Sequence, residues 1–345
     1  MSSACDQATV TPAAVASPRN RYFDLLRAMA LVRIITYHSL GLAWLTVVFP
    51  AVGLMFALGG SLMAASVDRS GLSAVGRRLR RLLPPLWMIA LIVVPVMLLS
   101  GLRPSWSLLL WLLPLRSPPV NGWGTETLGI VWYLREYLWF VLLSPPALAA
   151  FRRWPVPVVL SPLALLGTLM VTGWIVPTEV ADFAVYGGCW LLGFAQHDGL
   201  LRRLGRPALL GVAGALAAVG AGWLFTHPGP RGYDLNDNAL SNALWSMAFA
   251  LVLLGMAPSR APRARPRLAR ALRAVNSRAM TLYLWHSTAI GVTYLLARHW
   301  SVDLGGHLGH LALVASVLTL LAVAVLAFGW VEDLAARRRP VLVPG

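Results

Sequence analysis

Long apolar stretches separated by short arginine-rich segments constrain the fold of this 345-residue chain more than any other feature. Hydrophobic residues make up 58% of the sequence and charged residues only 12%, a balance typical of polytopic membrane proteins. A helix needs roughly 20 apolar residues to cross a bilayer. We therefore expect an all-α polytopic membrane protein with about ten transmembrane helices, at residues 21–49, 50–66, 86–99, 128–150, 156–176, 183–196, 207–226, 239–256, 279–297 and 311–330.

The arginines predict how these helices are oriented. The chain contains no lysine, so all 29 basic residues are arginine. Of these, 23 fall on one side of the predicted bundle, four on the other and two within spans. Cytoplasmic loops carry the excess of positive charge, so we expect both termini in the cytoplasm and the protein in the plasma membrane. This pattern also explains the net charge of +16, and we expect the lipid bilayer rather than nucleic acid as a partner.

Few segments remain outside the predicted bundle at 21–334. Residues 1–20 lack the apolar core of a signal peptide, and we expect a disordered cytoplasmic tail there, with a second tail at 335–345. We interpret 68–85 as a basic loop and 106–115 as an interfacial or re-entrant segment, too short to cross. The two cysteines are too few for a disulfide framework or a zinc site, and we expect no metal.

The first predicted span carries four ionisable residues, Asp24, Arg27, Arg33 and His38. Charges inside a span are costly and mark functional sites by default. Arg27 and His38 are eleven residues apart, which places them within about 20° on one helix face and about 16 Å apart. Asp24 could orient the Arg27 guanidinium, whereas Arg33 points elsewhere. The alternative is that Arg27 only anchors the helix and His38 is a core histidine.

Glu136, in the fourth predicted span, falls at about the same depth as His38. A histidine beside a carboxylate can act as a general base whose tautomer the carboxylate fixes. We therefore predict His38, Arg27 and Glu136 as catalytic residues. The alternative is that Glu136 only neutralises Arg33 or Arg135.

Four arginines, Arg77, Arg78, Arg80 and Arg81, lie next to the membrane on the predicted cytoplasmic side. They have two interpretations, topology with anionic-lipid contact, or binding of a phosphorylated cofactor, because guanidinium binds phosphate bidentately. Trp285 and His286, in the sequence TLYLWHS, form a further possible site.

Five segments in this order resemble the acyltransferase-3 family of integral membrane O-acyltransferases, from about residue 21 to 332. The first contains Arg27 and His38 with ten residues between them, the most specific match. The others are the arginine-rich GRRLRRLLPP segment, Trp132 with Glu136, the LYLWHS segment and the closing GWVEDLAARR. The chain departs from the family at Gly59-Gly60-Ser61, where Ser-Gly-Phe or Ser-Gly-Tyr is usual.

The resemblance implies transfer of an acyl group, commonly acetyl, from cytoplasmic acyl-CoA to a hydroxyl. Its acceptors include exported glycans of the bacterial cell envelope, glycolipids and small molecules. Asp24, Trp132, Trp285 and His286 become possible site residues. The competing class is a transporter or proton-coupled permease, since intramembrane arginine, histidine and glutamate also serve ion relays. The sequence shows no internal repeat, which argues against that class.

Overall fold

The computed structural model describes residues 21–122, 124–258 and 265–342. Within these ranges the secondary structure is helical, with no β-strand. The helices are α1 (Arg21–Leu40), α2 (Trp44–Val48), α3 (Ala51–Ser70), α4 (Ser73–Leu99), η1 (Trp106–Trp111), α5 (Thr125–Arg153), α6 (Pro155–Thr172), α7 (Thr178–His197), α8 (Leu200–Arg203), α9 (Arg206–Thr226), η2 (Leu235–Asp237), α10 (Ala239–Gly255), α11 (Pro266–Ser277), α12 (Ala279–His299), α13 (Gly306–Phe328) and α14 (Trp330–Ala335).

The all-α fold of a membrane protein is confirmed, and each predicted span contains one long helix. By length and composition, five helical segments in the described ranges are able to cross a membrane. They are Trp44–Ser70, Ser73–Leu99, Pro155–Thr172, Arg206–Thr226 and Gly306–Phe328. The count of ten spans and the side of the termini stay predictions, and the tail at 1–20 lies outside the described residues.

Two predicted boundaries were wrong. The first helix ends at Leu40 rather than continuing to residue 49, because Gly41 adopts a left-handed φ of +63°, a conformation that ends helices at little cost for glycine. The predicted loop at 68–85 is helical except for a turn at Gly71, and α4 continues through Pro84 and Pro85. Each proline removes one backbone hydrogen bond, but the Arg- and Leu-rich sequence before them favours helix.

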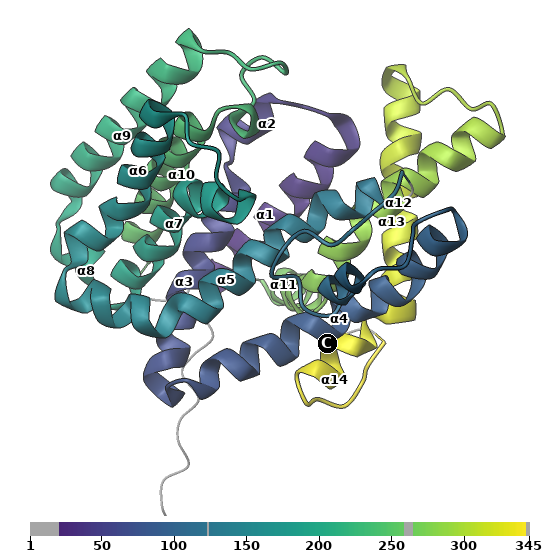
Figure 1. Cartoon of the computed structure of the whole chain (residues 1–345), viewed down its shortest axis with the longest axis horizontal. Helices are drawn as coiled ribbons and strands as arrows, with labels where there is room; N and C mark the ends of the chain where they lie inside the picture. The colour runs from purple at the N-terminus through teal and green to yellow at the C-terminus, as the bar shows by residue number, and fades with distance from the viewer. Residues whose placement is uncertain (1–20, 123, 259–264, 343–345) are drawn as a thin grey trace, which may run out of the picture.

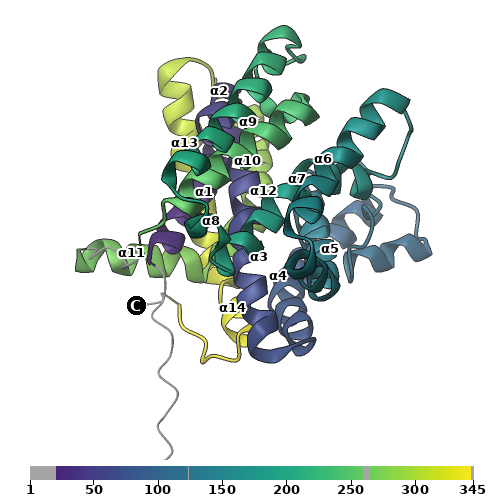
Figure 2. The same cartoon turned by 90° about the vertical axis from the view of Figure 1, so that its left-hand side faces the viewer.

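Two shorter helices, α11 and η1, lie outside the predicted spans. The amphipathic helix α11 was not predicted, and it runs crosswise to the long helices (Figure 2). Pro266 stands in its first turn, where a missing N–H costs least. The 106–115 segment forms the short helix η1 and does not cross, in agreement with its length.

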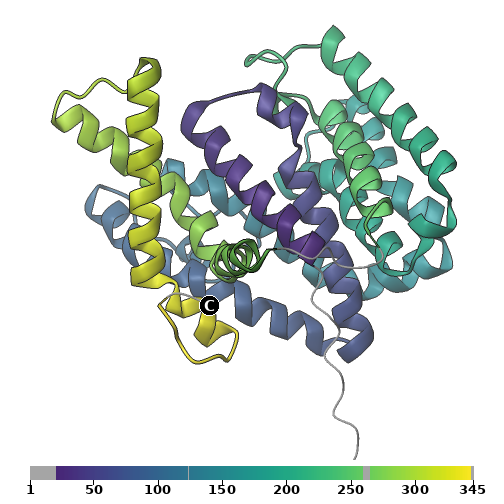
Figure 3. The same ribbon diagram turned by 180° about the vertical axis from the view of Figure 1, so that it is seen from behind.

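The core is built around the α3–α7 contact, with α10 beside both (Figure 1). A Cβ on Gly60 would lie 2.1 Å from the Trp190 carbonyl oxygen, and one on Gly193 would lie 2.1 Å from that of Ala57. The two backbones thus touch directly, as the small residues of the second span predict. Viewed from behind, α1 lies between the α12–α13 pair and the α3–α10 group (Figure 3), so the proposed catalytic helix contacts both halves.

Candidate active site

A cavity of about 940 Å³ opens at the end of the bundle where α1 begins and α3 ends. Guanidinium groups dominate its charged lining, with fewer carboxylates between them. The arginines are Arg27, Arg69, Arg77, Arg78, Arg81, Arg202 and Arg338, and the acidic residues are Asp24, Glu332 and Asp333. The volume is at the upper end of the roughly 300–1,000 Å³ found for small-molecule sites. The cavity therefore has the size and the charge for a phosphorylated ligand.

Three of the four arginines predicted to bind a cofactor line this cavity. Arg77, Arg78 and Arg81 face it from the first half of α4. Arg80 does not, since it is turned roughly 100° around the helix from their mean direction. Its Nε is buried without a hydrogen bond in the described part of the chain. Arg80 is thus not among the residues that line this cavity, and its role as a cofactor ligand stays a prediction.

The inner part of the cavity is apolar and aromatic. Leu31, Met55, Tyr133 and Tyr283 line it, from α1, α3, α5 and α12. The Tyr283 hydroxyl donates to the carbonyl oxygen of Ile130 at 2.8 Å, which fixes the ring. A ligand that entered with its anionic end at the arginines would place its other end against these side chains.

Two histidines meet one helical turn beyond Tyr283. The His38 and His286 ring centroids are 5.1 Å apart. His286 is fully buried, and its Nδ1 lies 2.5 Å from the Tyr283 carbonyl oxygen. A carbonyl only accepts, so Nδ1 carries the proton and Nε2 of a neutral ring is an acceptor, with Ser287 Oγ 3.5 Å away. His38 itself is exposed and does not line the cavity; His286 and Tyr283 lie between.

A polar network surrounds the residue before His38. The Tyr37 hydroxyl donates to Asp234 Oδ2 at 2.6 Å and accepts from Arg231 Nη1 at 2.5 Å and Asn236 Nδ2 at 3.2 Å. Asp234 is completely buried. Arg33, which was predicted to point away from Arg27 and His38, stacks over the Tyr37 ring at 4.9 Å. The sequence signal for this network is only a polar loop rich in Gly and Pro before α10.

No hydrogen bond joins Glu136 to His38 in the described residues. Its carboxylate is fully buried, and neither oxygen has a hydrogen-bond partner in the described residues. The charged groups around it are Asp182, Arg135 and Glu179. Arg135 is itself paired with Asp182 and lies 3.6 Å from Glu179. The carboxylate whose charge reaches His38 belongs to Asp234 instead.

The remaining predicted site residues separate into two groups. Asp24 lines the cavity together with Arg27, and its backbone carbonyl accepts from Asn276 Nδ2 at 2.9 Å. Trp132 packs against Tyr186 in the aromatic core, with ring centroids 5.6 Å apart. Trp285 stacks on Phe328 at 4.5 Å. The two tryptophans are outside the cavity lining.

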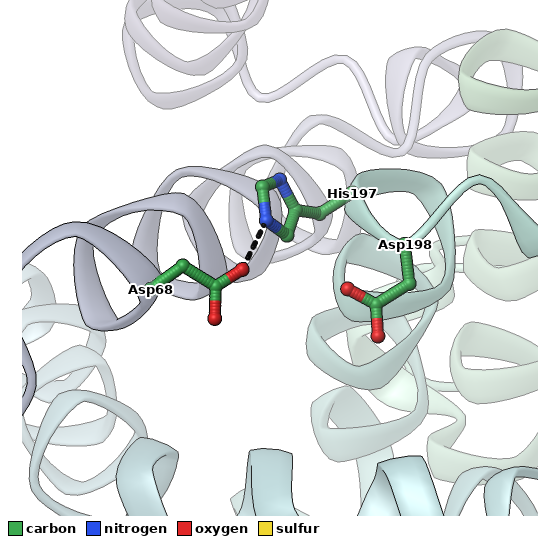
Figure 4. Close-up of side chains that lie close together, drawn as sticks. All are labelled: Asp68, His197 and Asp198. Carbon is green, nitrogen blue, oxygen red and sulfur yellow. Dashed lines mark hydrogen bonds and ion pairs between the residues drawn. The ribbon is translucent and has the colours of Figure 1, made fainter.

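Asp68, His197 and Asp198 lie close enough together to hold a metal ion, with ligand atoms within 4.8 Å of one another (Figure 4). Arg152 already donates two hydrogen bonds to each aspartate, at 2.8–2.9 Å, and His197 Nε2 lies 2.8 Å from Asp68 Oδ2. A metal ion would have to displace this guanidinium. The cluster is thus an ion-pair network that joins the ends of α3, α5 and α7.

Comparison with known proteins shows the family of the chain. The family model described as an acyltransferase domain, that of the acyltransferase-3 family, matches residues 20–331, nearly the whole chain. No curated protein and no solved structure matches the chain. The matched range includes Arg27, His38, the arginines of α4 and His286. The chain belongs to the acyltransferase-3 family and is a membrane acyltransferase that moves groups other than amino-acyl groups.

Proposed function

We propose that the protein transfers an acyl group, acetyl in the simplest case, from acyl-CoA to a hydroxyl of a glycan, a glycolipid or a small molecule. One observation carries the proposal. Tyr283 lines the arginine-rich cavity, its ring centroid is 5.6 Å from that of His286, and His286 contacts His38. A polyanion site, an apolar inner end and a histidine pair thus follow one another in space.

The arginines suit the donor. Acyl-CoA carries several phosphate groups, and guanidinium binds phosphate oxygens through paired hydrogen bonds. Arg77, Arg78 and Arg81 would hold the nucleotide end, with Arg27 deeper in the cavity. The pantetheine arm would then extend toward Met55 and Tyr283, which present an apolar surface to the acyl group.

His38 is the proposed general base. The acceptor hydroxyl oxygen attacks the thioester carbonyl carbon while the imidazole takes the hydroxyl proton. The new C–O bond forms, the C–S bond breaks, and the thiolate of CoA leaves and receives the proton from His38. Because the His38 side chain is exposed, an acceptor can reach it without passing through the donor cavity.

The proposed orientation places the cavity in the cytoplasm, where acyl-CoA is available. It assumes ten spans, both termini in the cytoplasm and the plasma membrane as the site. The 23-to-4 distribution of the arginines supports it. The arginines that line the cavity belong to the richer side.

A proton-coupled permease is the second candidate, and one observation favours it. Glu136 is buried with both carboxylate oxygens unpartnered in the described residues, as in a side chain that carries a proton across the membrane. A permease would move its substrate without consuming acyl-CoA. Measuring free CoA and the acyl ester that purified protein forms in nanodiscs therefore separates the two functions.

Donor binding tests the role of the arginines. Replacing Arg77 and Arg81 with glutamine removes two cavity charges, and we expect acyl-CoA affinity to fall about tenfold or more, with the larger loss at low salt, where screening is weakest. The matched control is Arg267 and Arg270 of α11, which lie outside the cavity lining. Equilibrium binding to purified variants is the measurement. Wild-type affinity for acyl-CoA in the Arg77/Arg81 variant would contradict donor binding by these arginines and would favour their role in topology.

A further inference from the structure

We propose that Asp234 is a positioning residue for acyl transfer, acting on His38 through Tyr37. The inference rests on the proposed function, in which His38 is the base. Asp234 belongs to the loop between α9 and α10, 197 residues from Tyr37 in the sequence. The juxtaposition of this loop with the last turn of α1 arises only in the folded chain.

The carboxylate of Asp234 is held at both oxygens. Oδ1 accepts from the backbone N–H of Asn236 at 2.9 Å, and Oδ2 accepts from the Tyr37 hydroxyl at 2.6 Å. Arg231 Nη1 lies 3.4 Å from Oδ2 and supplies the countercharge. A buried carboxylate with these partners has one orientation, and its hydrogen bond to a hydroxyl is of the strong, charge-assisted kind. Tyr37 is therefore fixed at its hydroxyl end.

The Tyr37 ring transmits this constraint to His38. The two ring centroids are 5.0 Å apart in an edge-on arrangement with an interplanar angle of 79°. The Arg33 guanidinium also stacks on the Tyr37 ring at 4.9 Å, and Arg33 Nε donates to the Leu45 carbonyl oxygen at 3.1 Å. The His38 imidazole is thus bounded by Tyr37 and by His286, whose ring centroid is 5.1 Å away.

The position of this network explains why such support is needed. His38 lies two residues before the end of α1, and the last turn of a helix has carbonyls without intrahelical partners and frays readily. Gly41 follows with a left-handed φ. The loop itself is attached to α2, because the Leu235 N–H donates to Thr46 Oγ1 at 3.0 Å. The α1 end, α2 and the loop before α10 hold one another in place around the base.

A purely structural role for Asp234 is the competing explanation, and Asp237 provides the control for it. Asp237 belongs to the same loop, and its carboxylate accepts from the backbone N–H and the guanidinium of Arg231. Within the described residues it makes no hydrogen bond to Tyr37. Loss of Asp237 therefore removes contacts inside the loop, whereas loss of Asp234 removes the acceptor of the Tyr37 hydroxyl.

The test uses full-length Tyr37→Phe, Asp234→Asn, the double variant, Asp237→Asn and His38→Ala in nanodiscs, with acetyl-CoA as donor. Tyr37→Phe keeps the ring, its stack on Arg33 and its edge against His38, so this variant tests the hydrogen bond even if Asp234→Asn folds poorly. We expect kcat to fall roughly 10- to 100-fold in Tyr37→Phe and in Asp234→Asn. The KM for acetyl-CoA should stay within about twofold, because the arginines that hold the donor are unchanged.

Two further results are expected because Asp234 and Tyr37 act as one unit. The double variant should lose no more kcat than either single variant, and Asp237→Asn should stay within about threefold of wild type. Wild-type kcat in both single variants beside an inactive His38→Ala would overturn this inference alone. Additive losses in the double variant, or an equal loss in Asp237→Asn, would also overturn it. Wild-type turnover by His38→Ala would overturn the proposed function and this inference with it.

Discussion

Glu332 joins α14 to the start of α12. Its Oε1 accepts from the Thr281 backbone N–H at 2.8 Å and from the Thr281 hydroxyl at 2.6 Å. Burial raises the pKa of Glu332 from its usual 4.5 to about 6, although both hydrogen bonds oppose the shift. The folded protein therefore holds this proton more tightly than the unfolded chain does. Its contribution to stability is fully present below about pH 4.5 and is lost as the pH rises through 6.

Glu332→Gln tests this charge. Glutamine keeps an acceptor for Thr281 but carries no charge that burial can penalise. We expect a higher Tm than wild type at pH 7.5 and no difference at pH 4.5, measured by thermal unfolding in detergent. A variant that is less stable than wild type by the same amount at both pH values would contradict the account.

At the residue scale, sequence reasoning was most informative where helical geometry alone decides. One continuous helix carries both Arg27 and His38, and Arg77, Arg78 and Arg81 line the cavity from one side of α4 because their spacing is fixed by the helix. The carboxylate near His38 was not predictable in this way. Glu136 matched in depth, but depth along a helix gives no information on which faces meet. Asp234 lies in an irregular loop, and only the tertiary fold brings it to Tyr37.

At the scale of elements, the α3–α7 contact depends on glycine. A Cβ at Gly60 would lie 2.1 Å from a backbone oxygen of α7, which has no side-chain freedom to move away. We expect Gly60→Ala to destabilise the protein by about 1–3 kcal/mol. Gly214→Ala in α9 is the control, since nothing lies within 4 Å of its Cβ position. Thermal unfolding of the two variants is the measurement, and an equal Tm for both would contradict this packing.

Element types were more predictable than element boundaries. Apolar length predicts a helix at each of the ten ranges, and each range contains one. The prolines at 84 and 85 indicated a loop, yet α4 passes through both, because the helix-favouring residues before them and packing after them outweigh the lost hydrogen bonds. Gly41 had the opposite effect and ended α1 earlier than its apolar sequence indicates.

For the whole molecule, the topology can be tested without any assay of activity. The α3–α4 turn at Gly71 and the loop that follows α9 lie at opposite ends of the bundle (Figure 1). Reporter fusions after Gly71 and Gly229 should therefore report opposite sides of the membrane. A fusion after Gly199 should report the same side as Gly71, because Arg152 joins Asp68 to Asp198 at that end. The same side for Gly71 and Gly229 would contradict the predicted topology.

Acyl transfer by purified wild-type protein and His38→Ala in nanodiscs tests the central claim most directly. General-base catalysis typically contributes about 10²- to 10⁴-fold in rate. Wild type should form an acyl ester and release CoA in equal amounts. His38→Ala should bind acetyl-CoA with unchanged affinity, because the arginine-lined cavity is intact, and form no detectable ester. Turnover by His38→Ala at the wild-type rate would contradict the assignment of His38 as the base.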